Sequence, residues 1–523
     1  MKSHIPLINM KPSSHRTAEE SLGVEYLASQ LIENGYSVDI FDNWVDTTMS
    51  NEGIYQSVLK QKDDICFVGT SSYMMSNEPT IDLIQRLRDA DINVVAGGYG
   101  PTFEPKKFLD AGANMVSIGE GENTIIKIAE FFSKKSTDIS ILDGVVYLDN
   151  GELKKTDKHD FVCDLDTLAF PERPYTQLLQ ARKSTINVLS SRGCMGNCSF
   201  CSIAAYGLLH NGERWRSRSI DNVIAELKDL QQQNVTAVKF VDDSFIENER
   251  DNQWCADFAQ ALSNNNMEMQ FRASIRADKV NMDNMRLLKN AGFVSFSCGI
   301  ENGSETALRR MGKIASLKDN LNAIRCFNAN DLYIQAGFIL FDDKTTIREL
   351  EENYAFLSDN IGLVSKGVFS EMFAAEGTKF TETLPINDGK KLSSNKLYLV
   401  EDYQARQVYD YLKKWQANHT EIYDKVIDPI SAPKAIPFDD MKKYHDLMIF
   451  LKRIDLQFMK DLITQTKNSG DLDMLYESYV RTFSSTFERC SQQVFEYYES
   501  DCLQYDAEIN HFITMDNVQK GSE

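Results

Sequence analysis

Three cysteines stand close together in the stretch SSRGCMGNCSFCSIAAYG, residues 190–207, at positions Cys194, Cys198 and Cys201. The chain has 10 cysteines in 523 residues, so this spacing arises by chance in only about four of a thousand such chains. One interpretation is a buried helical stripe, because the three positions share a helix face and free cysteine packs as a small hydrophobic residue. Two glycines and an asparagine within the stretch disfavour a helix and favour a loop that wraps a metal centre.

The number of cysteines limits which metal centre they can hold. Thiolates are soft ligands that select zinc or iron-sulfur clusters. A structural zinc site needs four nitrogen or sulfur ligands, but no second Cys-x-x-Cys lies near, and the nearby histidine is His210. Three thiolates on a four-iron cluster leave one iron open to a small molecule. The residues therefore predict a [4Fe-4S] cluster with an open coordination position.

The Cys-x-x-x-Cys-x-x-Cys pattern, with Phe200 before its last cysteine and a predicted strand before it, resembles the radical S-adenosylmethionine (SAM) superfamily. The segments RWRSRS, FVDDSF, FRASIRAD and CGIENGSETALRRMGK follow in the order of the branch whose radical domain comes after a cobalamin-binding domain. The segments ESLGVEYLASQLIENGYSVDIFD, VGTSSYMMS, GGYGPTF and IGEGENT are similar to that cobalamin-binding domain. The resemblance covers about residues 5–380 and implies a [4Fe-4S] cluster, SAM and cobalamin as cofactors.

The resemblance also implies roles for individual residues. The three cysteines would ligate the cluster, and Phe200 would lie against the adenine of SAM. Further residues near SAM would be Asp242, Asp243, Ser244, Ser274, Arg276 and Glu301. The cobalamin site would contain Thr70, Ser71, Ser72, Gly97, Gly98, Tyr99, Gly119, Glu120, Gly121 and Glu122. Two structural alternatives remain open: residues 242–244 could cap the next helix, and Arg276 with Glu301 could form an ion pair at the barrel rim.

Some features depart from related cofactor sites. The Asp-x-His-x-x-Gly signature of some cobalamin proteins is absent, so the resemblance implies cobalamin bound without a histidine ligand. We interpret His15 as a solvated loop residue and not as a cobalt ligand. Phe341 stands where relatives often have glycine. Gly98 begins a Gly-Tyr-Gly turn after the fourth predicted strand, and a nicotinamide dinucleotide fingerprint would follow the first strand.

The predicted elements would place these residues at strand ends. From about residue 5 to 135, five β-branched runs alternate with amphipathic helices and predict an α/β domain with a doubly wound parallel sheet. A second alternating series has six strand runs, ending with KGVFSEMFAAEG, and predicts a partial (β/α)6 barrel whose ligands gather at the carboxyl ends of its strands. Long helical patterns follow after about residue 390, and their aromatic residues are expected to form core. The predicted domains are residues 1–140, a linker with a hairpin at Asn150-Gly151 over 141–184, the barrel over 185–385, and a helical region over 386–523.

Composition excludes several classes of function. Hydrophobic residues make up 42% and charged residues 25%, and no apolar run approaches the length of a membrane span. The start of the sequence has no secretion signal, so we expect a cytoplasmic protein in a reducing compartment. With 77 acidic and 56 basic residues, the net charge of −21 repels phosphate backbones and disfavours nucleic acid as a partner.

The resemblance implies an oxygen-sensitive enzyme in which electron transfer from the cluster cleaves SAM to methionine and a 5'-deoxyadenosyl radical. The favoured reaction is methylation of an unactivated carbon in a small-molecule or peptide substrate, with two SAM molecules per turnover and an external electron donor such as flavodoxin or ferredoxin. A radical rearrangement, cyclisation or ring contraction is the main alternative, and a non-enzymatic iron-sulfur or corrinoid sensor is a third. Methylthio transfer is disfavoured because the N-terminal domain has only Cys66 before the linker. Tyr206 and His210 are candidate substrate-pocket residues.

Overall fold

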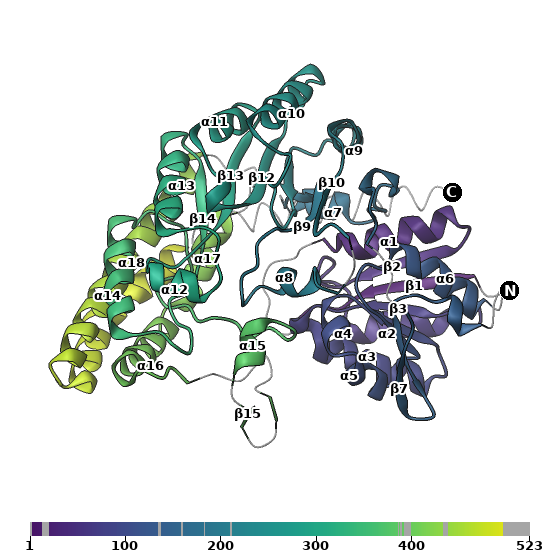
Figure 1. Cartoon of the computed structure of the whole chain (residues 1–523), viewed down its shortest axis with the longest axis horizontal. Helices are drawn as coiled ribbons and strands as arrows, with labels where there is room; N and C mark the ends of the chain where they lie inside the picture. Colours follow the sequence, from purple (N-terminus) through teal and green to yellow (C-terminus); the bar gives the residue numbers. More distant parts are fainter. Residues whose placement is uncertain are drawn as a thin grey trace.

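The computed structural model of the chain contains a mostly parallel seven-stranded β-sheet, a parallel five-stranded β-sheet, helices that flank both, and a helical C-terminal region (Figure 1). It describes residues 3–12, 20–133, 138–157, 161–182, 184–209, 212–384, 386–387, 390–391, 399–431 and 438–494. Among these residues, no helix is both long enough and apolar enough to cross a lipid bilayer.

The N-terminal sheet has seven strands. They are β1 (His4–Asn9), β2 (Ser37–Asp42), β3 (Val68–Ser71), β4 (Val94–Gly97), β5 (Met115–Ser117), β6 (Val145–Asp149) and β7 (Glu152–Lys155), in the spatial order β2-β1-β3-β4-β5-β6-β7. Strands β1 to β5 are parallel and coincide with the five predicted runs. The chain changes direction across the sheet between β1 and β3, which is where doubly wound folds bind ligands.

Helices cover both faces of this sheet. They are α1 (Leu22–Glu33), α2 (Asn51–Lys60), α3 (Asn77–Asp89), α4 (Tyr99–Phe103), α5 (Pro105–Asp110) and α6 (Glu122–Phe132), with 3₁₀ turns η1 (Met74–Ser76) and η2 (Ile139–Ile141). Apolar side chains of α1 and α6 form a core with one face, and those of α2, α3 and α5 form a core with the other. Alternate strand residues enter the two cores, as the two-residue period of a strand requires. The predicted doubly wound fold is therefore confirmed.

The hairpin turns at the predicted position, where Asn150 and Gly151 have φ of 49° and 83°. It was predicted to lie in a linker, but its strand β6 pairs antiparallel with β5, from Val116 to Val146. The hairpin thus extends the N-terminal sheet, because the edge of β5 offers free backbone hydrogen-bonding groups.

The second sheet forms the predicted partial barrel. Its five parallel strands are β8 (Ile186–Val188), β11 (Ala237–Phe240), β12 (Gln270–Arg276), β13 (Phe293–Glu301) and β14 (Tyr333–Phe338), in that spatial order. The helices between and after them are α9 (Ile220–Gln232), α10 (Asn252–Asn264), α11 (Met282–Asn290), α12 (Glu305–Arg310), α13 (Leu317–Ala329) and α14 (Ile347–Asp359), with η4 (Ala277–Lys279). Before the barrel lie η3 (Leu165–Thr167) and α7 (Thr176–Ala181).

The sixth predicted strand run, residues 366–377, forms no regular ladder. It runs beside the end of the barrel through an isolated bridge from Phe341 to Glu371. At this bridge the Phe341 N–H donates to the Ser370 carbonyl at 3.0 Å, and the Met372 N–H donates to the Phe341 carbonyl at 2.8 Å. The side chain of Gln416 bonds the backbone of Phe369, accepting from its N–H at 2.7 Å and donating to its carbonyl at 3.1 Å. The run therefore meets the barrel at one bridge and a helix of the C-terminal region at Phe369.

The C-terminal region is helical, as predicted, and packs on the barrel. Its long helices are α16 (Tyr403–Ala417), α17 (Thr420–Ser431) and α18 (Phe438–Lys467), and residues 472–494 are also helical. Short elements before them are α15 (Lys379–Thr383), β15 (Ile386–Asn387) and β16 (Lys390–Lys391). Trp415 and Tyr423 are buried in the same core as the barrel helices. Aromatic residues here thus serve packing, as expected.

Candidate active site

The three cysteines lie in a loop closed by a two-stranded ribbon. The ribbon pairs β9 (Ser191–Gly193) with β10 (Trp215–Ser217), and the loop between them holds the cysteines and the short helix α8 (Ser202–Tyr206). Residues 194–200 are not helical. The interpretation as a buried helical stripe is therefore wrong, and the loop conformation is as predicted.

Hydrogen bonds from distant segments hold this loop in place. The backbone N–H of Ser199 donates to the carbonyl of Met311 at 2.8 Å, and Phe380 N–H donates to the carbonyl of Ser199 at 2.8 Å. The Arg214 guanidinium donates to the carbonyl of Gly196 at 2.9 Å. The barrel thus fixes the shape of the loop through its backbone.

The thiols of Cys194, Cys198 and Cys201 are partly exposed. Burial raises the pKa of each thiol, that of Cys194 to about 12, so iron binding must displace protons. In the part of the chain that the structure describes, no three His, Cys, Asp or Glu side chains are arranged for a single metal ion. A four-iron cluster binds its thiolates on separate irons. The loop therefore fits a cluster better than a mononuclear site, and the ligand set stays a prediction.

Glu247 and Arg276 lie beside Cys194. The Cys194 thiol donates to Glu247 Oε1 at 3.5 Å, and Arg276 donates to the same oxygen at 2.7 Å. Arg276 also contacts both carboxylate oxygens of Asp278 at 2.6 and 3.0 Å. The expected alternative, an ion pair of Arg276 with Glu301, is therefore wrong. Glu247 was not among the predicted site residues, although it stands two residues after the FVDDSF segment.

Glu301 ends β13 in a left-handed conformation, with φ of 60°, at a break in the strand register. Burial raises the pKa of its carboxyl group, and Lys313, with Nζ 3.4 Å from Oε1, acts in the opposite direction. Two glycines make room for the carboxylate: a Cβ at Gly299 would lie 2.5 Å from Oε1, and one at Gly337 would lie 3.3 Å from Oε2. A strained, buried carboxylate beside the cysteine loop is a functional candidate. Lys313 was missed, although it stands in the quoted RRMGK segment.

Asp242, Asp243 and Ser244 point in different directions. Asp242 is buried, accepts from two serine hydroxyls at 2.5 Å and pairs with Arg250 at 3.3 Å. The Ser244 hydroxyl donates to a backbone carbonyl at 3.2 Å inside the core. The alternative that these residues cap the next helix is wrong, because Asp251 caps α10. Asp243 alone of the three lines a cavity; its side chain is exposed to that space, and the loss of hydration among the surrounding protein atoms raises the pKa of its carboxyl group to about 6.

Phe200 and Ser274 occupy the barrel side of the loop. Phe200 packs against a small apolar cluster that includes Met311, Met372 and Phe380. Ser274 lies on β12 opposite Ser297 of β13, and its carbonyl accepts a hydrogen bond at 2.8 Å. Their proposed contacts with SAM stay predictions.

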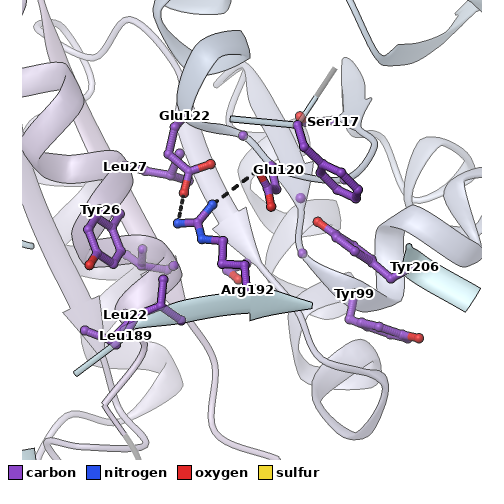
Figure 2. Close-up of a pocket in the computed structure, with 18 of the residues that line it drawn as sticks. Leu22, Tyr26, Leu27, Tyr99, Ser117, Glu120, Glu122, Leu189, Arg192 and Tyr206 are labelled. Atoms are coloured by element: carbon purple, nitrogen blue, oxygen red, sulfur yellow. Dashed lines mark hydrogen bonds and ion pairs between the residues drawn. The ribbon is translucent and has the colours of Figure 1, made fainter. Parts of the chain in front are cut away.

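A cavity of about 370 Å³ opens at the carboxyl ends of the N-terminal strands, facing the barrel (Figure 2). Every residue predicted to bind cobalamin lines it except Ser72, whose hydroxyl donates to Asn77 Oδ1 at 2.7 Å. The barrel contributes Arg192, Tyr206 and Asp243 to the same lining. The structure thus brings residues from the two predicted cofactor sites to one cavity.

Two rings meet at this boundary. Tyr99 of the N-terminal domain stacks on Tyr206, with ring centroids 5.9 Å apart and planes 19° apart. Tyr206, a candidate substrate-pocket residue, stands at the end of the helix that follows Cys201. His15 and His210 lie outside the described residues, and no histidine lines the cavity within the described part of the chain.

The cavity wall fits a large polar cofactor. The hydroxyls of Thr70 and Ser117 are buried there and have no hydrogen-bond partner among the described residues. Gly98 has φ of 89°, and a Cβ there would lie 2.9 Å from the Ser72 carbonyl oxygen, so only glycine suits this turn. Buried unpaired hydroxyls are costly unless a ligand or water satisfies them. The amide side chains of cobalamin offer matching donors and acceptors.

Comparisons with known proteins agree with this division of the chain. The family model of the radical SAM superfamily matches residues 188–357, and that of the B12 binding domain matches residues 16–129. An uncharacterized methyltransferase, PH0819 of Pyrococcus horikoshii, is 26% identical over 347 residues, covering 65% of this chain and 73% of that protein.

Two solved structures share the fold. The cobalamin-dependent SAM radical enzyme OxsB, with aqua-cobalamin bound, has a TM-score of 0.76 at 17% identity and covers 98% of this chain and 84% of its own. The radical SAM methyltransferase TsrM of Kitasatospora setae, with tryptophan and a SAM analogue bound, has a TM-score of 0.58 at 14% identity. That match covers 73% of this chain and 75% of TsrM.

Proposed function

Because this chain belongs to the cobalamin-dependent radical SAM enzymes, we propose that it methylates an unactivated carbon of a small-molecule or peptide substrate. The observation that carries the proposal is the cavity shared by the two domains. Its barrel lining includes Arg192, two residues before Cys194, and Tyr206, five residues after Cys201. A substrate at this boundary would face both cofactors. The name of the Pyrococcus horikoshii relative supports methyl transfer.

When bound, the cluster would supply an electron that converts one SAM to methionine and a radical able to remove a substrate hydrogen as 5'-deoxyadenosine. Cobalamin would carry a methyl group from a second SAM, which leaves as S-adenosylhomocysteine, and an external donor would supply two electrons in all. The protein would bind and orient these groups. The three cysteines would hold the cluster, and the hydroxyls of Thr70 and Ser117 would hold polar groups of cobalamin.

Two carboxylates are suited to the cationic part of SAM. Asp243 is ionised near neutral pH, because the pKa of its carboxyl group is about 6, and its Oδ2 accepts the backbone N–H of Gly193 at 2.9 Å. Glu301 is held beside Lys313 next to the cysteine loop. Charge-assisted hydrogen bonds from an ammonium group to carboxylates are stronger than those between neutral groups. Asp242 is not proposed as a ligand, since its oxygens are engaged in the core.

A radical rearrangement or ring contraction is the second candidate. The name of a relative favours it: the anaerobic magnesium-protoporphyrin IX monomethyl ester cyclase of Synechocystis sp. is 23% identical over 334 residues, covering 61% of this chain and 64% of that protein.

An experiment with trideuteromethyl-labelled SAM distinguishes the two candidates without a known substrate. The anaerobic protein, loaded with cluster and cobalamin, is reduced in the presence of the labelled SAM, and the corrinoid is extracted for mass spectrometry. Methyl transfer predicts a corrinoid that carries a CD₃ group. An unlabelled corrinoid, from protein that still produces 5'-deoxyadenosine, would instead support rearrangement.

A further inference from the structure

The ribbon that closes the cysteine loop carries two arginines directly opposite each other. Arg192 on β9 and Arg216 on β10 are partners in the strand register. Like charges in opposite positions destabilise a strand pair, and a ribbon of three residues per strand is itself marginal. The ribbon therefore needs a compensating charge from outside the barrel.

Two glutamates of the N-terminal domain supply that charge (Figure 2). Arg192 lies 2.6 Å from Glu122 and 3.4 Å from Glu120. The Arg216 guanidinium donates to both carboxylate oxygens of Glu120, at 2.6 and 3.1 Å. Bidentate pairs of this kind add geometric specificity to the charge attraction. Both glutamates also line the cavity predicted to hold cobalamin, and their contact with that cofactor stays a prediction.

These four side chains, which we call the arginine latch, are nearly shielded from water. The exposed fractions are 14% for Arg192, 5% for Arg216, 8% for Glu120 and 5% for Glu122. The ring of Phe161 lies 4.3 Å from the Arg216 guanidinium carbon. A buried ion pair that loses one partner leaves an uncompensated charge, which is strongly destabilising. Separating the arginines from the glutamates is therefore costly.

The latch is rigidly joined to the cysteine loop. Gly193, between Arg192 and Cys194, has φ of 86°, and its N–H is held by Asp243 at 2.9 Å. At the other end of the loop, the chain runs from Arg214 directly into β10 and Arg216. Both ends of the loop are therefore tied to the turn and helix start that carry Glu120 and Glu122, which line the predicted cobalamin cavity.

We infer that Arg192 and Arg216 are positioning residues that fix the [4Fe-4S] loop at a set distance from the bound cobalamin. The latch acts on the cysteine loop through the ribbon that closes it. The inference goes beyond the proposed function, because methylation and rearrangement both need the two cofactors held in one geometry.

The test measures that geometry in the loaded protein. The reduced cluster and cob(II)alamin are both paramagnetic, so the splitting of the cobalt EPR signal by the cluster reports their separation. We expect one uniform splitting in the wild type and a broadened or lost splitting in Arg192→Gln and Glu122→Gln. Reversing the pair, Arg192→Glu with Glu122→Arg, should restore a defined splitting. Arg86→Gln, which breaks an exposed ion pair of 2.6 Å within the N-terminal domain, is the matched control and should resemble the wild type.

A wild-type splitting in loaded Arg192→Gln protein would overturn the inference. If that variant does not retain both cofactors, the inference is tested by amide hydrogen exchange of the cofactor-free protein. Residues 194–209 should then exchange at least about tenfold faster in Arg192→Gln and Glu122→Gln than in the wild type and Arg86→Gln, because their anchor opens more often. Equal exchange rates would also overturn the inference, and this outcome does not depend on which reaction the enzyme performs.

Discussion

Replacing Gly193 with alanine should open the ribbon that closes the cysteine loop. Gly193 has φ of 86°, which costs about 1–2 kcal/mol for a residue with a Cβ. The new Cβ would also overlap the carbonyl oxygen of Arg214 and come within 2.9 Å of its carbonyl carbon. Those atoms belong to backbone, so no rotamer change relieves the overlap. Overpacking of this kind costs a further amount of about 1–3 kcal/mol.

The two costs sum to about 2–5 kcal/mol, which exceeds what a ribbon of three residues per strand can be expected to withstand. Gly151→Ala is the control that separates the cost of a positive φ from the cost of the steric overlap. Gly151 has nearly the same φ, 83°, but no atom lies within 4 Å of its added Cβ. That variant should lose about 1–2 kcal/mol of local stability through strain alone.

The assay is the iron and sulfide content per chain after anaerobic reconstitution, together with hydrogen exchange of the cysteine loop. We expect Gly193→Ala to bind less than about a tenth of the wild-type iron, which corresponds to at least about 1.4 kcal/mol. Gly151→Ala should bind a full complement. Full iron content in Gly193→Ala would refute the reasoning that the ribbon must stay closed to hold the cluster.

Three further predictions concern Cys198, Asp242 and Lys452. Cys198→Ala should lose the cluster and the formation of 5'-deoxyadenosine while keeping its corrinoid, and an intact cluster would remove this residue from the ligand set. Asp242→Asn should destabilise the barrel by about 3 kcal/mol by leaving Arg250 buried without its counter-charge; a mild melting shift combined with weaker SAM binding would instead make Asp242 a ligand. Burial lowers the pKa of Lys452 to about 7. Between about pH 7 and 10 its amine is therefore protonated in the unfolded chain but neutral in the folded chain. The free energy of unfolding should consequently rise with pH, by up to about 1.4 kcal/mol per pH unit over this range. Thermal melts of Lys452→Met should lack this rise, and parallel melting curves for both proteins would contradict the assignment.

Local patterns in the sequence were sufficient for the strands and the cysteine loop. The β-branched runs of the N-terminal sheet and the spacing of the three cysteines depend on neighbours in sequence, so they can be recognised without the fold. Asp242 and Asp243 could not be told apart in this way, because adjacent residues at a strand end point to opposite sides and only the packed structure shows which side is the cavity.

The contacts between residues far apart in the chain could also not be predicted from the sequence. Nothing in the sequence around Glu120 and Glu122 indicates that arginines are their partners. Those arginines lie in the ribbon of the barrel domain, 70 or more residues further along the chain. The sixth strand run has a suitable composition, yet it pairs with the barrel only through an isolated bridge at Phe341, and Gln416 of a C-terminal helix bonds the backbone of Phe369. Both outcomes depend on contacts between domains or between distant elements.

The most direct test of the account is the corrinoid content of protein that is produced with cobalamin available and purified without oxygen. Absorbance and mass spectrometry of the extract, with an iron assay on the same sample, give both cofactors per chain. The account predicts close to one corrinoid and one four-iron cluster in each chain. Protein that is folded and holds its cluster but contains no corrinoid would contradict it.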